Sequence, residues 1–220
     1  MQTITDELIS FDSIIGNEAA TSILQNIIDN NNIVPAYLFT GKLGIGKFKA
    51  TVIFANKLVE SYFEILIVNN ESINIEQIRE TIKFASTKPA IGNKKVIIID
   101  AESELSEKCS NALLKLLEEA PSYTVVIIVS SYAVLPTIQS RCHTIEFHPL
   151  TNQEIATVIK NYGYNEIQAS IINAACGSAK IALELSKVWD IIKPLVDKLS
   201  IPPNSILKAL EYSKAFNILL

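Results

Sequence analysis

The sequence predicts an α/β fold in which helices flank a mostly parallel, five-stranded sheet, followed by a smaller all-helical part. The strongest observation is the run Lys95–Asp100, where four consecutive β-branched residues precede an acid, as is typical of a strand buried on both faces. Such runs alternate with segments of helical periodicity, which favours right-handed βαβ crossovers. From residue 150 onward only helical patterns remain, interrupted by Gly163, Gly177 and the pair Pro202-Pro203.

The individual elements follow from apolar periodicity and from the residues that interrupt it. Strands are expected at residues 36–40, 64–68, 95–100, 124–129 and 144–147. Helices are expected from residue 17 to the asparagines at 30–32, at 46–61, around Ile75 to Ile82, and at 111–119. We therefore expect an α/β domain at 1–149, a helical lid at 150–188, and the start of a truncated or shortened helical region at 189–220.

Composition and charge restrict the class of protein. The chain has 220 residues, of which 49% are hydrophobic and 19% charged, so it is expected to fold around a sizeable core. It lacks an apolar run long enough for a spanning helix and a basic-then-apolar leader, which predicts a cytoplasmic protein without membrane contact. A formal net charge of −4 argues against a free-standing DNA-binding surface.

The three cysteines are Cys109, Cys142 and Cys176. They lie far apart and form no C-x-x-C pair, so the sequence indicates neither a zinc site nor a disulfide framework. We expect plain buried thiols and no metal site.

A glycine-rich turn between a predicted strand and a predicted helix is the main candidate site. Its sequence is Gly41-Lys42-Leu43-Gly44-Ile45-Gly46-Lys47-Phe48. Gly41, Gly46 and Lys47 have the spacing of the phosphate-binding loop, in which backbone N–H groups cradle phosphates at a helix N-terminus. The pattern requires a hydroxyl at the eighth position to bind Mg²⁺, and Phe48 has none. The loop suits ATP, ADP or a bare anion equally, so the sequence leaves its occupant open.

Asp100 is the second candidate for this site. It ends the run Lys95–Asp100, where phosphate-loop proteins keep an acid near Mg²⁺, although a strand-end Asp also serves as a cap or turn former. An ATP-hydrolysing enzyme of this kind needs a glutamate next, to polarise the attacking water. The next residue here is Ala101.

Taken together, these segments resemble the AAA+ clamp-loader subunits of bacterial replicative DNA polymerase. The resemblance covers residues 11 to about 185 and is carried, in order, by Phe11–Asn17, Gly41–Lys47, Lys95–Asp100, Asn111–Glu119 and Ser140–Cys142. It implies a P-loop AAA+ module with a small helical lid. Within the family the chain is most similar to the delta-prime type of subunit, the DNA polymerase III stator.

The resemblance assigns roles to further positions. Phe11–Gly16 resembles the stretch that packs around adenine, although an apolar entry into a helix is the alternative reading. Ser130-Ser131 lies where the family senses the γ-phosphate, against the alternative of an ordinary strand end. Lys180 stands where an active ATPase has a second-sensor arginine. A lysine keeps the positive charge but cannot form the bidentate contact of an arginine with phosphate. An exposed helix lysine is the alternative there.

Arg141 has the most specific implied role. In Ser140-Arg141-Cys142 of the family, the arginine projects into the ATP site of the neighbouring subunit and stabilises the transferring phosphoryl group in trans. An arginine at a strand edge that forms an ordinary ion pair is the alternative. Because Phe48, Ala101 and Lys180 depart from the hydrolytic pattern while Arg141 is kept, the resemblance implies a subunit that completes a neighbour's site.

The implied function is that of a largely non-hydrolysing clamp-loader subunit, with its own ATPase activity absent or very weak. Implied partners are gamma/tau and delta subunits and the sliding clamp, with primed-template DNA reached only through the assembled complex. Two alternatives stay open: an ATP-hydrolysing gamma/tau-like subunit, and a pure scaffold with a relic loop. Family members often carry a four-cysteine zinc module, whereas this chain has no cysteine between Ala55 and Ile73, so no zinc is expected.

Overall fold

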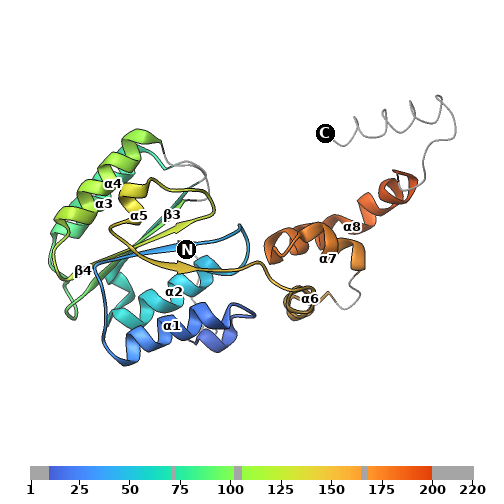
Figure 1. The fold of residues 1–220 in the computed structure, drawn as a ribbon, viewed down its shortest axis with the longest axis horizontal. Helices are drawn as coiled ribbons and strands as arrows, with labels where there is room; N and C mark the ends of the chain where they lie inside the picture. The colour runs from blue at the N-terminus through green and yellow to red at the C-terminus, as the bar shows by residue number, and fades with distance from the viewer. Residues whose placement is uncertain (1–9, 71–72, 102–105, 165–167, 200–220) are drawn as a thin grey trace.

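The computed structural model describes residues 10–70, 73–101, 106–164 and 168–199, which form a five-stranded sheet, the helices that cover it and a further group of helices (Figure 1). The strand order is β2-β3-β4-β1-β5, and the described strand pairings are all parallel. The strands are β1 (Ala36–Thr40), β2 (Ile65–Asn70), β3 (Lys95–Ala101), β4 (Thr124–Ser130) and β5 (His143–Glu146). The α/β fold class predicted from the sequence is confirmed.

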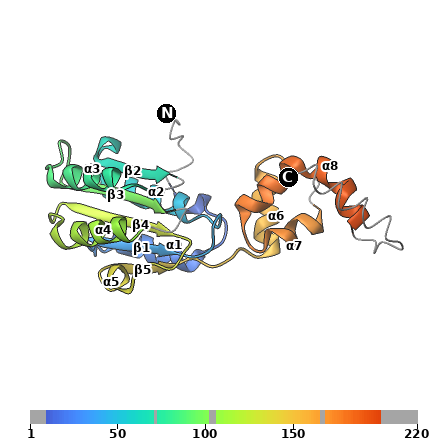
Figure 2. The same cartoon turned by 90° about the horizontal axis from the view of Figure 1, so that it is seen from above.

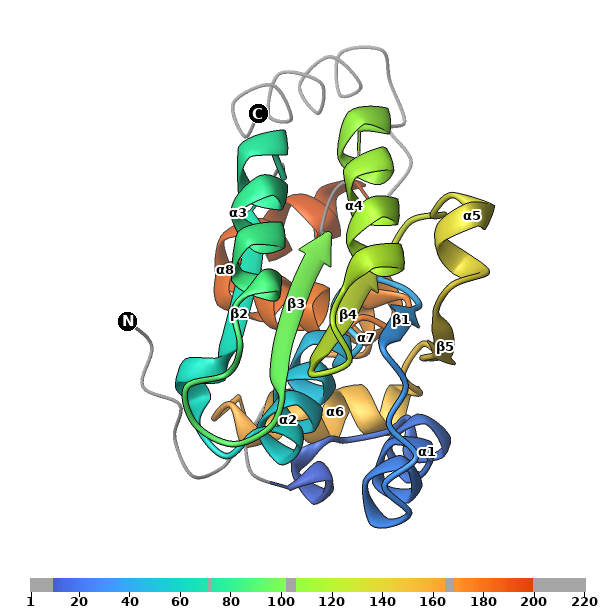
Figure 3. The same ribbon diagram turned by 90° about the vertical axis from the view of Figure 1, so that its left-hand side faces the viewer.

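Helices cover both faces of this sheet, because its central strands carry apolar side chains on both sides. On one face lie α1 (Glu18–Asp29) and α2 (Lys47–Leu58), and on the other lie α3 (Ile75–Ser86) and α4 (Glu107–Glu119). Figure 3 shows α3 and α4 side by side over β3 and β4. Two apolar cores result, one on each face of the sheet.

Two short helical segments precede strands, and a third precedes α1. The one-turn helix α5 (Pro136–Gln139) joins β4 to β5, and a 3-10 turn at Tyr62–Glu64 leads into β2. Another 3-10 turn at Phe11–Ser13 precedes α1 and buries Phe11 in the core on the α1 and α2 face.

The helices after β5 pack around a core of their own. They are α6 (Asn152–Asn161), α7 (Ala169–Ala175) and α8 (Ala179–Leu199), and Figure 2 shows them set apart from the sheet. Their shared core includes Leu150, Ile155, Ile171 and Trp189. The boundary expected between residues 188 and 189 falls inside α8, so the division into a lid and a further region stays a prediction. In the part of the chain that the structure describes, no helix has the length and apolarity needed to span a membrane.

Several element ends differ from the expected ones. Helix α2 stops at Leu58 rather than near residue 61, because Ser61 caps the following 3-10 turn through its side chain. Strand β2 continues through Asn69 and Asn70, which the sequence indicated as a turn. Helix α4 begins at Glu107, earlier than expected, since the Ser106 hydroxyl accepts a hydrogen bond from the Cys109 N–H.

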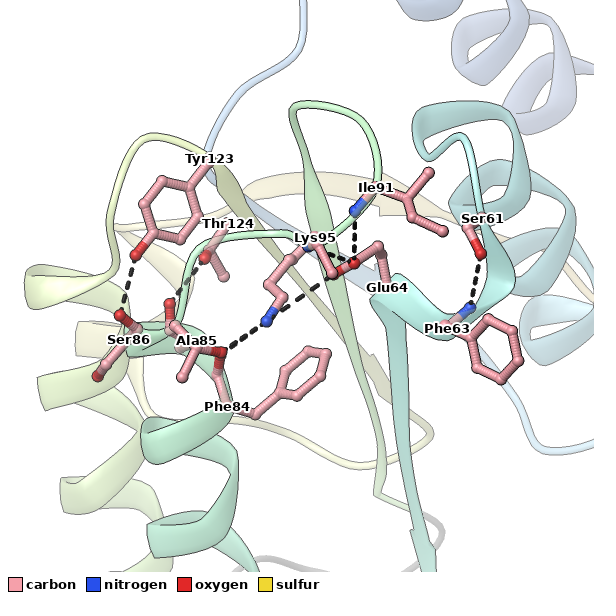
Figure 4. Close-up of polar contacts among 12 residues, drawn as sticks. Ser61, Phe63, Glu64, Phe84, Ala85, Ser86, Ile91, Lys95, Tyr123 and Thr124 are labelled. Carbon is pink, nitrogen blue, oxygen red and sulfur yellow. Dashed lines mark hydrogen bonds and ion pairs between the residues drawn. The ribbon is translucent and has the colours of Figure 1, made fainter.

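A buried ion pair fixes the edge at which the strands begin (Figure 4). Lys95 Nζ lies 3.8 Å from Glu64 Oε2, and it also donates a hydrogen bond to Thr87 Oγ1 at 2.6 Å. The second Glu64 oxygen accepts hydrogen bonds from the N–H groups of Ala90 and Ile91, at 2.7 and 3.1 Å. The pair therefore holds the loop before β3 against the start of β2.

Candidate functional site

The glycine-rich loop lies where the sequence predicts, between the end of β1 and the start of α2. Gly46 has φ +98° and precedes Lys47, the first residue of α2, so the helix N-terminus faces the loop. Gly41 has φ +139°, and a Cβ there would lie 2.3 Å from the carbonyl oxygen of Phe147. Only glycine fits this close approach between the loop and the chain after β5.

Lys47 is buried at the centre of this loop, with 4% of its surface exposed. Its Nζ donates hydrogen bonds to the carbonyl of Gly41 at 2.7 Å, to the carbonyl of Lys42, and to Ser131 Oγ at 3.0 Å. Burial lowers the pKa of Lys47 from 10.5 to about 8, and the nearby charge of Asp100 opposes that shift. The ammonium thus lies among backbone and hydroxyl oxygens that a bound phosphate would have to displace.

Asp100 and Ser131 come to the loop from neighbouring strands. Asp100 is next to last in β3 and Ser131 directly follows β4, and both strands end at the same edge as β1 because the sheet is parallel. The structure therefore brings Lys47, Asp100 and the predicted sensor position Ser131 together. Its neighbour Ser130 is buried instead, with its hydroxyl bonded to the backbone of Tyr132.

Phe48 and Ala101 lie at this same edge. Phe48 is half-buried against the apolar core under α1 and α2, and Ala101 is buried in the core under α3 and α4. Neither side chain has an oxygen that could bind a cation or activate water. Among the described residues, no three His, Cys, Asp or Glu side chains gather closely enough to hold a metal ion.

The tip of the loop is in contact with the first turn of α8. The backbone N–H of Lys180 donates a hydrogen bond to the carbonyl of Gly44 at 3.2 Å. A Cβ at Gly44 would lie 2.4 Å from Lys180 Cβ and 2.5 Å from Ser178 Oγ. Lys42 Nζ adds a hydrogen bond to the carbonyl of Cys176 at 3.4 Å. Lys180, the predicted second-sensor position, thus contacts the loop through its backbone N–H, and the residue as a whole is exposed.

The segment before α1 lies against the loop as well. Lys49 Nζ on α2 donates to the carbonyl of Ser13 at 2.7 Å, and Ile14 approaches Gly46. Asn17 is left-handed at φ 56° and joins two parts of the chain. Its amide nitrogen donates to the carbonyls of Ile45 and His148, while its oxygen accepts from the His148 N–H at 2.6 Å.

These contacts define what the site can do chemically. Backbone N–H groups at the N-terminus of α2 and a buried ammonium suit a phosphate group, which fits ATP, ADP or a bare anion. The residues fit a nucleotide-bound Mg²⁺ less well, because Asp100 is the one anionic ligand that the sequence predicts and the eighth loop position has no hydroxyl.

Arg141 lies away from this loop. It precedes β5 by two residues, at the edge where the parallel strands begin, whereas the loop follows β1 at the edge where they end. Its Nη2 is 2.6 Å from Glu118 Oε1 on α4, and its Nη1 donates to the carbonyl of Thr137 at 2.9 Å. The structure therefore separates the predicted loop residues from Arg141.

The expectation that all three cysteines are buried is wrong for one of them. Cys109 is buried and Cys142 is partly buried, with burial raising the pKa of the Cys142 thiol to about 11. Cys176 is exposed, contrary to the expectation of three buried thiols. It ends α7 in a left-handed conformation at φ 48°, a capping position that lies at the surface.

The contacts of three residues in this region were not predicted from the sequence. Asn17, Ser178 and Glu118 make their contacts with residues distant in the chain, which periodicity does not reveal. A partial signal exists for Asn17, since asparagine is one of the few residues besides glycine that adopt a positive φ.

Comparison with known proteins identifies one matching family model and several similar proteins. Residues 60–151 match the family model described as DNA polymerase III, delta subunit. DNA polymerase III subunit tau of Bacillus subtilis is 33% identical over 172 residues, which cover 66% of this chain and 30% of that protein. A replication factor C small subunit of Methanococcus vannielii is 28% identical over 167 residues, covering 71% of this chain and 52% of that protein.

A solved structure extends the likeness to the whole fold. The RuvB Holliday junction branch migration motor of Thermotoga maritima superposes with a TM-score of 0.62 at 18% identity, covering 96% of this chain and 72% of that one. At this identity the likeness shows a shared fold. The alignments span about a third to a half of the length of the two curated relatives.

Proposed function

Because this chain belongs to the AAA+ clamp-loader family, we propose that it acts in DNA replication as a delta-prime-type subunit of a DNA polymerase III clamp loader. In this role it is a largely non-hydrolysing member of a hetero-oligomer. The assembly places a sliding clamp on primed DNA, and this chain contributes a group to the ATP site of a neighbouring subunit.

The observation that carries this proposal is the position of Arg141. Its guanidinium lies at the edge of the sheet opposite the loop of its own chain, with 39% of the side chain exposed, so a second subunit can reach it. The sequence has two arginines, Arg79 and Arg141, while its other basic residues are lysines. Because a guanidinium can hold a phosphoryl group at two points, an exposed arginine suits a finger that acts in trans.

The loop of the chain itself supports the second half of the proposal. Phe48 supplies no hydroxyl for Mg²⁺, and Ala101 supplies no carboxylate to activate water. Loss of a general base alone lowers turnover by roughly 10²–10⁴-fold. The buried Lys47 is bonded to its own loop, so nucleotide binding there has to break existing hydrogen bonds.

The proposed partners are the other subunits of such an assembly, of the gamma/tau and delta types, and the sliding clamp. Primed-template DNA is contacted by the complex as a whole, in keeping with the net charge of −4 of this chain. Subunit contacts through Arg141 also agree with the exposure of the Arg141 and Glu118 side chains, which are 39% and 52% exposed.

The test is the steady-state ATPase of the reconstituted complex with sliding clamp and primed DNA. Arg141→Ala is expected to lower the rate by about tenfold or more, which is over ~1.4 kcal/mol in the barrier. Arg79→Ala is the matched control, because Arg79 is also exposed but pairs with Glu76 on α3. If the two variants have the same rate, Arg141 is no finger and the pure scaffold is favoured.

A second candidate function is an ATP-hydrolysing subunit of the gamma/tau type. It is favoured by the convergence of Lys47, Asp100 and Ser131 and by the similarity to the tau subunit of Bacillus subtilis. MgATP turnover by the isolated chain that is abolished by Lys47→Ala would support this candidate. No turnover above the Lys47→Ala background is expected if the delta-prime role is correct.

A further inference from the structure

The guanidinium of Arg141 is fixed by two hydrogen-bonding partners on its own chain. Nη2 meets Glu118 Oε1 at 2.6 Å, and Nη1 donates to the carbonyl of Thr137 at 2.9 Å. A planar group held at two different nitrogens has a defined plane and direction. A guanidinium has five N–H donors, so these two contacts within the chain do not require its whole donor capacity.

The two partners come from different elements, so their positions are set by packing rather than by the local chain. Glu118 is in the last turn of α4, whose buried residues Leu113 and Leu116 anchor that helix to the sheet. Thr137 is on α5, which is anchored by the buried Ile138. Arg141 follows that short helix after the capping residue Ser140 and therefore lies between two fixed acceptors.

The ion pair contributes little to folding. The side chains of Arg141 and Glu118 are 39% and 52% exposed, and ion pairs in such positions contribute about 0–1 kcal/mol to stability. Either Arg141 or Glu118 can therefore be replaced while the fold is kept. What the pair does provide is order, because a free arginine side chain loses about 2 kcal/mol of rotamer entropy when it is fixed.

We propose that Glu118 is a positioning residue that holds Arg141 in the orientation needed to reach an anionic phosphoryl group on a neighbouring subunit. This inference rests on the proposed function, because it assigns a role within the same trans-acting site. Pre-ordering the side chain lowers the entropy lost when the finger engages, so removal of Glu118 lowers kcat more than it changes the KM for ATP.

The chain offers a matched control beside this residue. Glu119 is the next residue on α4, is similarly exposed, and lies 4.0 Å from Lys115 on its own helix instead of contacting Arg141. Glu119→Gln and Glu118→Gln therefore remove the same charge one position apart. The control separates the loss of a contact with Arg141 from a general change in surface charge.

The experiment measures kcat and KM for ATP in the reconstituted complex with sliding clamp and primed DNA. Glu118→Ala is expected to lower kcat by about three- to tenfold with KM changed less than about twofold. Glu118→Gln keeps an oxygen that can accept the bond from Nη2, so it is expected to keep more of kcat than Glu118→Ala. Glu119→Gln is expected to match the unmodified chain.

A double variant makes the test specific. In the Arg141→Ala background, Glu118→Ala is expected to cause no further loss, because a positioning residue acts only through the group that it positions. Additive losses would overturn the inference, and so would an unchanged kcat in Glu118→Ala. In both cases Arg141→Ala alone still lowers the rate, and the proposed function stands. If Arg141→Ala has no effect, the proposed function and this inference both fail. Thermal melting and size-exclusion profiles check that each variant folds and assembles.

Discussion

Lys47 carries a buried charge, and its pKa makes a prediction about stability. The pKa is about 8 in the folded chain against an ordinary 10.5, because burial disfavours the ammonium. At pH values between about 8 and 10.5, Lys47 binds more protons in the unfolded chain than in the folded chain, so the free energy of unfolding rises with pH in this range. From pH 7 to pH 9.5 the chain is expected to gain about 2 kcal/mol relative to Lys47→Met, which has no titrating group.

The measurement is urea unfolding of both proteins at the two pH values. Comparison with Lys47→Met removes the contributions of the other lysines and tyrosines, which both proteins share. If the free energies of unfolding change in parallel, Lys47 titrates at its ordinary pKa and its burial costs nothing.

At the scale of single residues, the sequence predicted the loop positions better than their contacts. Gly41, Gly46 and Lys47 were identified from spacing because a phosphate loop is a local feature, complete within eight residues. The contacts of Ser131 with Lys47 and of Glu118 with Arg141 join distant parts of the chain. No local pattern encodes them, since they depend on how whole elements are packed.

At the scale of helices and strands, the contact between the glycine-rich loop and α8 can be tested by substitution. Gly44→Ala would put a methyl group 2.4 Å from Lys180 Cβ and 2.5 Å from Ser178 Oγ, so the first turn of α8 has to move. We expect faster amide hydrogen exchange in residues 178–183 and a loss of about 1–3 kcal/mol in the free energy of unfolding.

Gly163→Ala provides the control for that variant. Gly163 also has a positive φ, +91°, but a Cβ there meets nothing within 4 Å. The Gly163→Ala variant therefore has the backbone strain of a non-glycine residue at positive φ without a steric clash against a neighbouring side chain. Equal exchange at residues 178–183 in the two variants would mean that the loop does not hold α8.

The buried pair of Glu64 and Lys95 is expected to be far more important for stability than the exposed pairs. Glu64→Ala leaves the Lys95 ammonium buried with one partner fewer, which costs about 3–5 kcal/mol, whereas Glu76→Ala breaks an exposed pair with Arg79 and costs under ~1 kcal/mol. Chemical denaturation of the two variants measures both values. Similar losses would contradict the view that Glu64 organises the loop before β3.

Element types were predictable from the sequence, and element ends were not. The apolar runs of β3 and β4 identify buried strands, because strands covered on both faces have no polar alternation. The end of α2 was missed because Ser61, Tyr62 and the following residues form a separate turn with its own cap. Strand β2 was predicted too short because Asn69 and Asn70 read as turn residues, yet both pair with β3.

For the whole molecule, the parallel sheet has one main consequence. It puts the ends of β1, β3 and β4 at one edge, with Lys47 and Asp100, and the start of β5 at the other, with Arg141. A chain built in this way has one face that can hold a phosphate and another that can supply a cation to a different molecule. In the proposed assembly, we expect these two faces to lie in two different subunit contacts.

The most direct test of this account compares Lys47→Ala with Arg141→Ala in the same reconstituted clamp-loader complex, with sliding clamp and primed DNA present. Steady-state ATP hydrolysis is measured for complexes that are shown by size-exclusion chromatography to contain every subunit. The proposed role predicts that Arg141→Ala lowers the rate by about tenfold or more, while Lys47→Ala changes it by less than about twofold. A large loss with Lys47→Ala and none with Arg141→Ala would contradict it, because the chain would then hydrolyse ATP in its own loop.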